Sequence, residues 1–425
     1  MAVSNYIKTI MEYIDVQSWQ DTWIVDDVFP VSEKSGVDKK LSESGYWIKL
    51  VNVDDQVRVP VRYLLADKNL VSHASFISDD DGLLSSGRAF QVEWNHPGLK
   101  REYVNSHNSQ VQNIWYLNDD TLASVNRNRK IEKAVEKEYK EIIDKVKNKV
   151  IPESDLISDL EFLQHPQINL HVMNVGQGDT IVLRFPGNRI WLIDAYLHSN
   201  QYKNAICESE FYDWLYLKYP EFFIERFIIS HLHYDHIMSA QKIITTLQPN
   251  AVIFCHTPVG KTTTALKLLR EASDRNILYE LRGTESRTKS GFGFCLVAAS
   301  NLANKANSSD QNHHGIIMDV VTKKSHLLLP GDAGWEQIDG FLGSKCNLTN
   351  KRTKYYKVTH HCSNTGYNAK FLSYYSPDYA YTSCSNGNRY GHPDQVTLKE
   401  INRLTNGSHV VTCEQKGISL DATIH

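Results

Sequence analysis

The segment that most constrains the fold of this chain is Ser230-His231-Leu232-His233-Tyr234-Asp235-His236. It follows the apolar run Phe227-Ile228-Ile229 and precedes Ile237 to Thr246, which has the pattern of a helix. Imidazoles at alternate positions can point the same way from an extended loop, while the carboxylate and imidazole that follow can face a second ion. The spacing therefore predicts a site for a pair of metal ions. A chance polar turn beside a core strand is the alternative, because the chain has 18 histidines.

The length and composition of the chain predict a globular protein with more than one domain. A chain of 425 residues exceeds what one hydrophobic core usually serves. Its 41% of hydrophobic and 22% of charged residues are ordinary values, which argues against a disordered, fibrous or disulfide-rich class. The net charge of -3 gives no overall attraction for nucleic acid, so a polyanion would need a locally basic surface.

The cysteines and the hydropathy of the chain predict its cellular compartment. The seven cysteines are odd in number and form no CxxC pair, which predicts neither a disulfide framework nor a zinc knuckle. No apolar run approaches the roughly 18 residues of a membrane span, and the first residues lack the apolar core of a signal peptide. We expect a soluble, cytoplasmic protein without a membrane partner.

A change of pattern near residue 150 predicts a domain boundary. Asn128 to Val150 has apolar residues near the helical period between dense lysines and glutamates, and Pro152 with the polar run after it interrupts this pattern. Before the helix, Tyr46 to Val53 and Val57 to Val61 have the pattern of strands. We therefore predict an N-terminal mixed α+β domain at residues 1–150, a linker at residues 151–165 and a second domain at residues 166–425.

The second domain has the pattern of a layered α/β arrangement. Several short apolar runs end in polar clusters, and helical segments lie between some of them. The predicted strands are Ile168 to Val175, Phe227 to Ser230, Val252 to Cys255, Leu327 to Leu329 and Tyr379 to Ser383, and the predicted helices include Ser239 to Leu247 and Thr262 to Ala272.

The motifs of residues 166–425 resemble those of a known family. The string HLHYDH is similar to the HxHxDH signature of metallo-β-lactamase-fold hydrolases. The opening His171 to Thr180, with VGQGD at its centre, resembles the branch that includes the hydrolase domain of the bacterial competence DNA-uptake channel. The resemblance implies an α/β fold, the αββα sandwich, which follows the N-terminal α+β appendage along the chain. It also implies an orienting role for Asp194 and a place for Asp179 among the possible ligands.

Two later motifs resemble further parts of the same site. The run Leu327 to Asp332 matches a strand followed by Gly-Asp, which implies that Asp332 bridges two metal ions, although a lone Gly-Asp is usually only a turn. Tyr356 to Ser363 resembles the strand-HHGS motif, with Cys362 in place of its glycine, and implies a late histidine ligand. We favour His360 for this role, and His361 would then orient a ligand or face the substrate.

The segment before the strand Ile316-Ile317-Met318 departs from many members of the fold, which carry a further histidine there. Asn312 matches the channel-like branch, while His313 or His314 could restore the ligand; both histidines could equally be exposed loop residues. The sequence therefore does not decide which residues bind the second metal ion.

The remaining candidates concern the substrate. Ser383 to Pro393 is similar to the SxGxNxYGHP ending of the branch, in which His392 could be a general acid or a clamp on a phosphate oxygen, and a purely structural His-Pro turn is the alternative. Cations are interleaved with aromatics from Lys351 to Lys357, a pattern that can contact phosphates and stack bases but also occurs in a solvated strand. The candidate substrate contacts are Ser363, Asn388, Tyr390 and Lys354.

The resemblance implies a metal-dependent hydrolase that cleaves a phosphodiester, with nucleic acid or a nucleotide as substrate. The expected cofactors are two divalent ions, zinc or manganese, and Asp235 would also steer the attacking water. A hydrolase of a small cyclic nucleotide, ester or lactam and a non-enzymatic, metal-stabilised interaction module are the alternatives, and the N-terminal domain could bind a protein partner. The expected ligands are His231, His233, Asp235, His236, Asp332 and His360.

Overall fold

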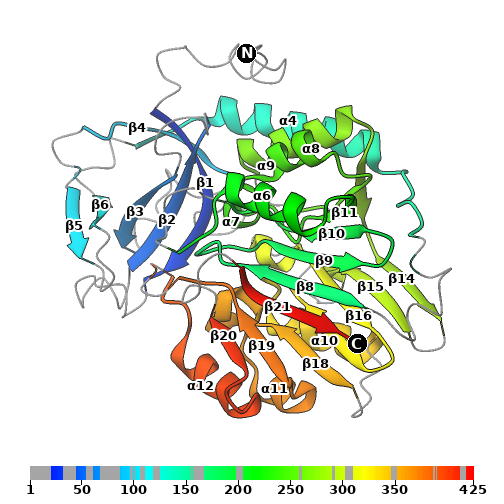
Figure 1. The fold of residues 1–425 in the computed structure, drawn as a ribbon. Coiled ribbons are helices and arrows are strands. Elements are labelled where there is room, and N and C mark those ends of the chain that lie inside the picture. Colours follow the sequence, from blue (N-terminus) through cyan, green and yellow to red (C-terminus); the bar gives the residue numbers. More distant parts are fainter. Residues whose placement is uncertain are drawn as a thin grey trace. The chain divides into compact units, whose positions relative to one another are not determined.

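The computed structural model describes most of the chain and forms two compact units (Figure 1). The first unit comprises residues 1–144, 258–270 and 387–391, and the second comprises residues 145–257, 271–386 and 392–425. The boundary expected at residues 151–165 stays a prediction. The described residues are 21–31, 45–53, 61–67, 87–95, 99, 101–105, 111–117, 125–154, 156, 167–197, 204–257, 261–289, 292–301, 310–345, 352–385, 388, 390–411 and 418–425.

The first unit contains a seven-stranded sheet in the order β5-β6-β3-β2-β1-β4-β7. One face of this sheet buries Trp23, Ile48, Leu64 and Phe90 in one cluster. Of the two predicted strands, the first corresponds to β2, and the second falls mostly in residues 54–60, outside the described residues. The strands are β1 (Thr22–Pro30), β2 (Gly45–Asn52), β3 (Val61–Asp67), β4 (Ala89–Val92), β5 (Arg101–Asn105), β6 (Val111–Leu117) and β7 (Val125–Arg127).

The helix expected at residues 128–150 is α4 (Arg129–Val146). Ile131, Val135, Ile142 and Val146 are all buried, so the apolar stripe read from the sequence is the packed face of the helix. Its charged residues lie on the other side, mostly exposed. In the described residues of this region, β structure is followed by a helix.

The second unit contains two seven-stranded sheets. The first sheet has the order β13-β12-β11-β10-β9-β8-β21, with parallel pairing from β10 to β13 and antiparallel pairing at the other strands. Its strands are β8 (Ile168–Met173), β9 (Ile181–Phe185), β10 (Arg189–Ile193), β11 (Phe223–Ile228), β12 (Val252–Cys255), β13 (Leu278–Leu281) and β21 (Ile418–Ile424). Helices α6 (Glu208–Lys218), α7 (Tyr234–Ile237) and α8 (Ala240–Leu247) are connected with these strands along the chain. Helix α9 (Thr263–Asp274) begins in the first unit and ends in the second.

The second sheet of this unit has the order β14-β15-β16-β17-β18-β19-β20. Its strands are β14 (Thr284–Lys289), β15 (Phe292–Ala298), β16 (Ile316–Val321), β17 (Ser325–Leu329), β18 (Thr353–Lys357), β19 (Tyr379–Thr382) and β20 (His409–Val411). Its helices are α10 (Trp335–Lys345), α11 (Ala369–Tyr375) and α12 (Gln395–Leu404), and the short 3₁₀ segments are η5 (Ala299–Asn301), η6 (Gln311–His313), η7 (Thr359–Cys362) and η8 (Asn364–Gly366).

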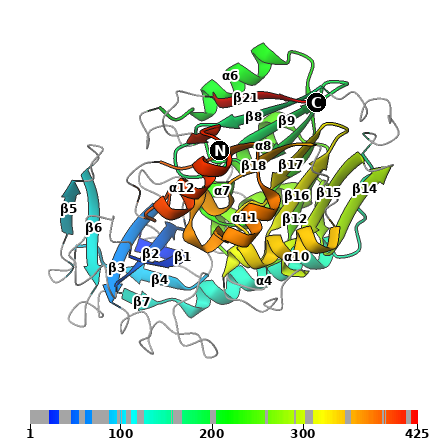
Figure 2. The ribbon, with the colours of Figure 1, turned by 90° about the horizontal axis from the view of Figure 1, so that it is seen from below.

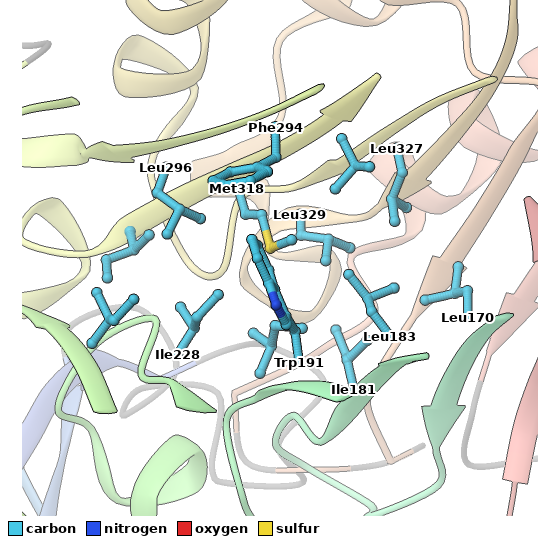
Figure 3. Close-up of a cluster of buried hydrophobic side chains, with 14 of the residues drawn as sticks. Leu170, Ile181, Leu183, Trp191, Ile228, Phe294, Leu296, Met318, Leu327 and Leu329 are labelled. Carbon is cyan, nitrogen blue, oxygen red and sulfur yellow. The ribbon is translucent and has the colours of Figure 1, made fainter. Parts of the chain in front are cut away.

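The two sheets of the second unit pack face to face. Figure 3 shows Leu183 and Trp191 of the first sheet opposite Phe294, Met318 and Leu329 of the second, and all five side chains are buried. The outer face of the second sheet packs against α10, α11 and α12 in a separate apolar cluster (Figure 2). Helices α6 and α8 lie on the outer face of the first sheet (Figure 1). The order of layers is thus helix, sheet, sheet, helix, as the resemblance implied.

Several strands end on the residues that were singled out from the sequence. Asp194 follows β10, the HLHYDH segment follows β11, Asp332 follows β17 and His361 follows β18. Because β10 and β11 are parallel neighbours, and β17 and β18 are too, each pair of strands brings its following residues to one edge of its sheet. Among the described residues, no helix is long and apolar enough to cross a membrane.

Candidate metal centre

Four buried side chains converge at the edge of the sandwich. One ligand atom from each of Asp179, His236, Asp332 and His361 lies within 4.8 Å of the other three. Nε2 of His236 and Nε2 of His361 both lie 3.2 Å from Oδ2 of Asp332, and the two nitrogens are 3.2 Å apart. Such convergence of imidazole nitrogens on a carboxylate is typical of a metal-binding site.

The far side of each imidazole ring is held by a fixed acceptor. Nδ1 of His236 contacts Oδ2 of Asp194 at 2.7 Å, and Nδ1 of His361 donates to the carbonyl oxygen of Ser383 at 2.6 Å. A proton on Nδ1 leaves the lone pair of Nε2 free, which is the tautomer that a metal ion requires. The structure therefore places Asp194 in contact with His236, where it orients the ring.

The remaining residues of the HLHYDH segment lie around this group. Nε2 of His231 is 3.9 Å from Oδ2 of Asp332 and 3.1 Å from Nδ1 of His233. Asp235 Oδ2 lies 3.8 Å from Nε2 of His361. All these side chains are buried, so the structure brings together His231, His233, Asp235, His236 and Asp332.

The two adjacent histidines of the late motif differ in their placement. His361 belongs to the converging group, whereas Nε2 of His360 is 3.9 Å from Asp332 and its Nδ1 contacts Oγ1 of Thr365 at 2.8 Å. The sequence analysis favoured His360 as the ligand, and the geometry favours His361. The difference arises because His360, His361 and Cys362 all have positive φ, of 48°, 51° and 65°, a tight turn that sends the second ring toward Asp332.

A lysine that the sequence analysis did not select lies inside the site. Nζ of Lys357 is 2.5 Å from Oδ2 of Asp179, 3.3 Å from Oδ1 of Asp332 and 3.1 Å from the carbonyl oxygen of Gly331. Its side chain is 1% exposed, so this ammonium is a fixed internal cation that holds both carboxylates. The signal in the sequence was a lysine that follows two tyrosines at the end of the strand, three residues before a histidine pair.

Burial and the neighbouring charges set the protonation of the group. Burial acts to raise the pKa of Asp332, but His361, His236 and Lys357 together lower it well below its ordinary value. Burial acts to lower the pKa of Lys357, yet Asp179 and Asp332 raise it to about 12. The pKa of His231 is lowered well below its ordinary value, first by burial and then by His236. Asp332 is thus a carboxylate and His231 a neutral imidazole, the forms that bind metal ions.

The segment with Asn312, His313 and His314 lies beside the HLHYDH segment, because Ile316 N donates to the carbonyl oxygen of Ser230. None of the three belongs to the converging group among the described residues. His314 is buried, while the His313 side chain is 21% exposed and lies 3.9 Å from Asp310. Asn312 is buried, and its Oδ1 has no hydrogen-bond partner among the described residues.

The four candidate substrate contacts are divided between the two units. Oγ of Ser363 accepts from the backbone N–H of Thr365 and so caps a 3₁₀ turn. Lys354 is buried on β18, where it pairs with His326 of β17. Asn388 and Tyr390 belong to the first unit, and the ring of Tyr390 stacks on Phe29 at 4.2 Å.

His392 lies beside the two histidines of the late motif. Its ring centroid is 5.4 Å from that of His360 and 6.3 Å from that of His361. Burial, followed by the nearby His360 and His361, lowers the pKa of His392 well below its ordinary value, so the ring is neutral at neutral pH. Gln177, which the sequence analysis did not select, reaches His392, with Nε2 3.4 Å from Nδ1.

The layers and the position of the converging side chains together determine the type of fold. Two face-to-face sheets with helices on the outer faces carry histidines and carboxylates after neighbouring strands at one edge. The fold is the metallo-β-lactamase sandwich. No protein-family model matches the sequence, and no curated protein matches it either.

Solved structures of metallo-hydrolases and a diiron enzyme are similar to the chain at low identity. A metallo hydrolase from the archaeon Ignicoccus hospitalis shares 13% identity, with 60% of this chain and 99% of that chain covered and a TM-score of 0.39. A diphosphatase of the PhnP family shares 11% identity over 61% and 99% of the two chains, with a TM-score of 0.32. A diiron β-hydroxylase from Streptomyces venezuelae shares 12% identity over 60% and 54%, with a TM-score of 0.38. These likenesses are distant, so the function proposed below rests on the geometry of the site.

Proposed function

We propose that this chain is a metal-dependent phosphodiesterase that cleaves nucleic acid or a nucleotide. The observation that carries the proposal is the convergence of Nε2 of His236 and Nε2 of His361 on Oδ2 of Asp332, each at 3.2 Å. Both rings have their Nδ1 held by an acceptor, so both Nε2 atoms face the same carboxylate oxygen.

The side chains present fit a pair of divalent ions. Histidine and carboxylate ligands suit zinc and manganese, the two metals that we propose. Oδ1 of Asp179 is buried and has no hydrogen-bond partner among the described residues, which leaves a further oxygen for a cation. The ligands would be His231, His233, Asp235, His236, Asp332 and His361, with Asp179 beside them.

Divalent ions bound here supply Lewis acidity that lowers the pKa of water toward about 7 and offsets the charge of a phosphate. The chain's own residues hold the side chains around the site in place. Asp194 and the Ser383 carbonyl hold the rings of His236 and His361 in place, and Lys357 holds Asp179 and Asp332. The neutral His392 is a hydrogen-bond donor beside these histidines.

Hydrolysis assays test this proposal directly. Single-stranded DNA, RNA and bis-p-nitrophenyl phosphate are incubated with the protein and added zinc or manganese. We expect metal-dependent cleavage by the parent protein and a loss of at least about 1,000-fold in the double variant His231→Ala, Asp332→Ala, since both changes remove ligands. The matched control is Asp339→Asn on the exposed face of α10, which should retain full activity.

Each outcome has a distinct meaning. Cleavage of a polymer that is lost in the double variant but kept in the control supports a nuclease, and turnover confined to small diesters supports a nucleotide substrate. Binding of the metal, measured by mass spectrometry of the eluted ions, without turnover of any phosphodiester would overturn the proposal.

A further inference from the structure

Three cationic side chains gather where β17 and β18 begin. Lys323 and Lys324 are exposed in the turn between β16 and β17. The guanidinium Nε of Arg352 donates to the carbonyl oxygen of Thr322 at 2.7 Å, and the N–H of Thr353 donates to the carbonyl oxygen of Lys324 at 2.8 Å. These hydrogen bonds hold the half-buried Arg352 beside the turn. We call Lys323, Lys324 and Arg352 the basic cluster.

Hydrogen bonds also fix the turn that carries the two lysines. The N–H of Thr322 donates to the carbonyl oxygen of Ser325, and the N–H of Ser325 donates to Oγ1 of Thr322, both at 2.9 Å. The hydroxyls of these two residues donate to the main-chain oxygen of His425, at 2.8 and 2.7 Å. The lysines are therefore presented from an ordered backbone, which lowers the entropy cost of binding a ligand there.

Two stacked tyrosines lie on the neighbouring strands β18 and β19. Tyr355 and Tyr379 pair directly across these strands, and their ring centroids are 5.1 Å apart with 14° between the ring planes. Tyr355 is half-buried, whereas Tyr379 is 45% exposed, so the outer ring of the stack reaches solvent. Tyr355 follows Arg352 by three residues, about 10 Å along an extended strand. The basic cluster and the stack thus form one continuous surface of the second unit.

The acceptors near this surface are already hydrogen-bonded. Asp378 precedes Tyr379, but its Oδ2 accepts from the backbone N–H of Lys354 at 2.7 Å. The main-chain oxygen of His425 accepts from the two hydroxyls of the turn. The charges of the basic cluster therefore outweigh that of Asp378, and the surface is complementary to an anion that carries flat rings.

We propose that the basic cluster and Tyr379 bind single-stranded nucleic acid away from the metal centre; the part of this surface in catalysis rests on the proposed function. The cations contact phosphates, and the exposed ring stacks on a base, which is independent of sequence. Thr353 lies at this surface and Lys357 in the metal centre, at the two ends of β18, about 13 Å apart on an extended strand. A polymer can contact both places, whereas bis-p-nitrophenyl phosphate cannot.

Binding is tested first, by fluorescence anisotropy of labelled oligo-dT and oligo-U of about 20 nucleotides, with EDTA present to prevent cleavage. Tyr379→Ala should weaken binding by about tenfold, and Tyr379→Phe should retain it, because stacking requires the ring and not the hydroxyl. The double variant Lys323→Ala, Lys324→Ala should reduce the slope of log affinity against log salt by about 1.4, the value for two phosphate contacts on a single strand.

Matched controls and steady-state rates complete the design. Tyr216→Ala removes a tyrosine of similar exposure on α6, and Lys137→Ala, Lys140→Ala removes two exposed lysines of α4; both should leave affinity and slope unchanged. With zinc or manganese present, Tyr379→Ala should raise KM for the polymer by about the factor lost in binding. Its kcat and its turnover of bis-p-nitrophenyl phosphate should equal those of the parent.

The outcomes separate this inference from the proposed function. Failure of the parent protein to bind either oligonucleotide would overturn the inference. So would affinities within about twofold of the parent in both Tyr379→Ala and the lysine double variant, even if the parent cleaves phosphodiesters. Weaker binding in these variants without any turnover by the parent would instead overturn the proposed function and leave the surface as a nucleic-acid contact.

Discussion

At the scale of single residues, the two adjacent histidines give a sharp prediction. We expect His361→Ala to weaken zinc binding by about 100-fold or more, because its Nε2 belongs to the converging group, and His360→Ala to weaken it by about tenfold or less. Competition of the purified variants with a chromophoric chelator measures both affinities. A larger loss of zinc affinity in His360→Ala than in His361→Ala would instead support His360 as the ligand, as the sequence analysis favoured.

The buried lysine gives a second prediction at this scale. Lys357→Met should destabilise the metal-free protein by about 3–5 kcal/mol, since it leaves the carboxylates of Asp179 and Asp332 buried without their cation. Bound metal should reduce this cost, because the ions neutralise the same carboxylates. Urea unfolding with EDTA and with zinc measures the difference, and Lys324→Met, an exposed lysine, is the control. A change below about 1 kcal/mol would contradict the role of Lys357.

The residues of the site could be predicted from the sequence where a motif combines residue type with spacing. The HLHYDH segment and Asp332 were found in this way, and the structure gathers them. The choice between His360 and His361 could not be made, because it depends on three consecutive positive φ angles. Glycine adopts such angles without strain, which is a physical reason for a glycine at the position of Cys362. Lys357 and Gln177 were missed because their roles come from partners distant in sequence.

At the scale of secondary-structure elements, the pairing of β8 with β21 and the end of α6 encloses a titratable side chain. His171 is buried, with its Nε2 2.6 Å from the hydroxyl of Tyr219 and its Nδ1 3.3 Å from Asp421. Burial is the main cause that lowers its pKa to about 4, against the opposing effect of Asp421 and with a further lowering by Lys218. The folded protein therefore binds this proton more weakly than the unfolded chain, whose histidine pKa is about 6.5.

This difference predicts the pH dependence of stability. Between about pH 6.5 and 4 the unfolded chain binds a proton that the folded protein does not, so the free energy of unfolding falls as the pH falls, by up to about 3 kcal/mol from this group. His171→Gln keeps a polar partner for Tyr219 but cannot titrate, so its stability should fall less steeply. Urea unfolding at a series of pH values, with EDTA throughout, compares the two proteins. Parallel curves would contradict the prediction.

Element boundaries followed from the sequence where periodicity is strong. Residues 252–255 were predicted as a strand and form β12, and α8 and α9 lie within a residue or two of their predicted bounds. By contrast, β11 begins at Phe223, four residues before the predicted strand, because Glu225 and Arg226 interrupt the apolar pattern. Their charges are satisfied within the fold: Glu225 accepts from the indole of Trp191, and Arg226 pairs with Glu285. Partners of this kind cannot be read from local sequence.

At the scale of the whole molecule, the division into units could be predicted only in outline. The sequence placed a β-rich region and a helix before the sandwich, and the structure has them. Residues 258–270 and 387–391, however, belong to the first unit although they are inserted far along the chain. Such interleaving depends on tertiary packing, which leaves no compositional change in the sequence to mark it.

The division into units also predicts where metal binding acts. All the proposed ligands belong to the second unit, so zinc at about 100 times its dissociation constant should raise the free energy of unfolding of that unit by about 2.7 kcal/mol. Hydrogen exchange followed by mass spectrometry should show slower exchange in peptides from β9, β10 and β16, with β1 and β2 unchanged. The variant His231→Ala, Asp332→Ala should abolish the effect. Equal slowing in β1 and β2 would mean that the units unfold together, because a ligand can stabilise only the cooperative unit that contains its site.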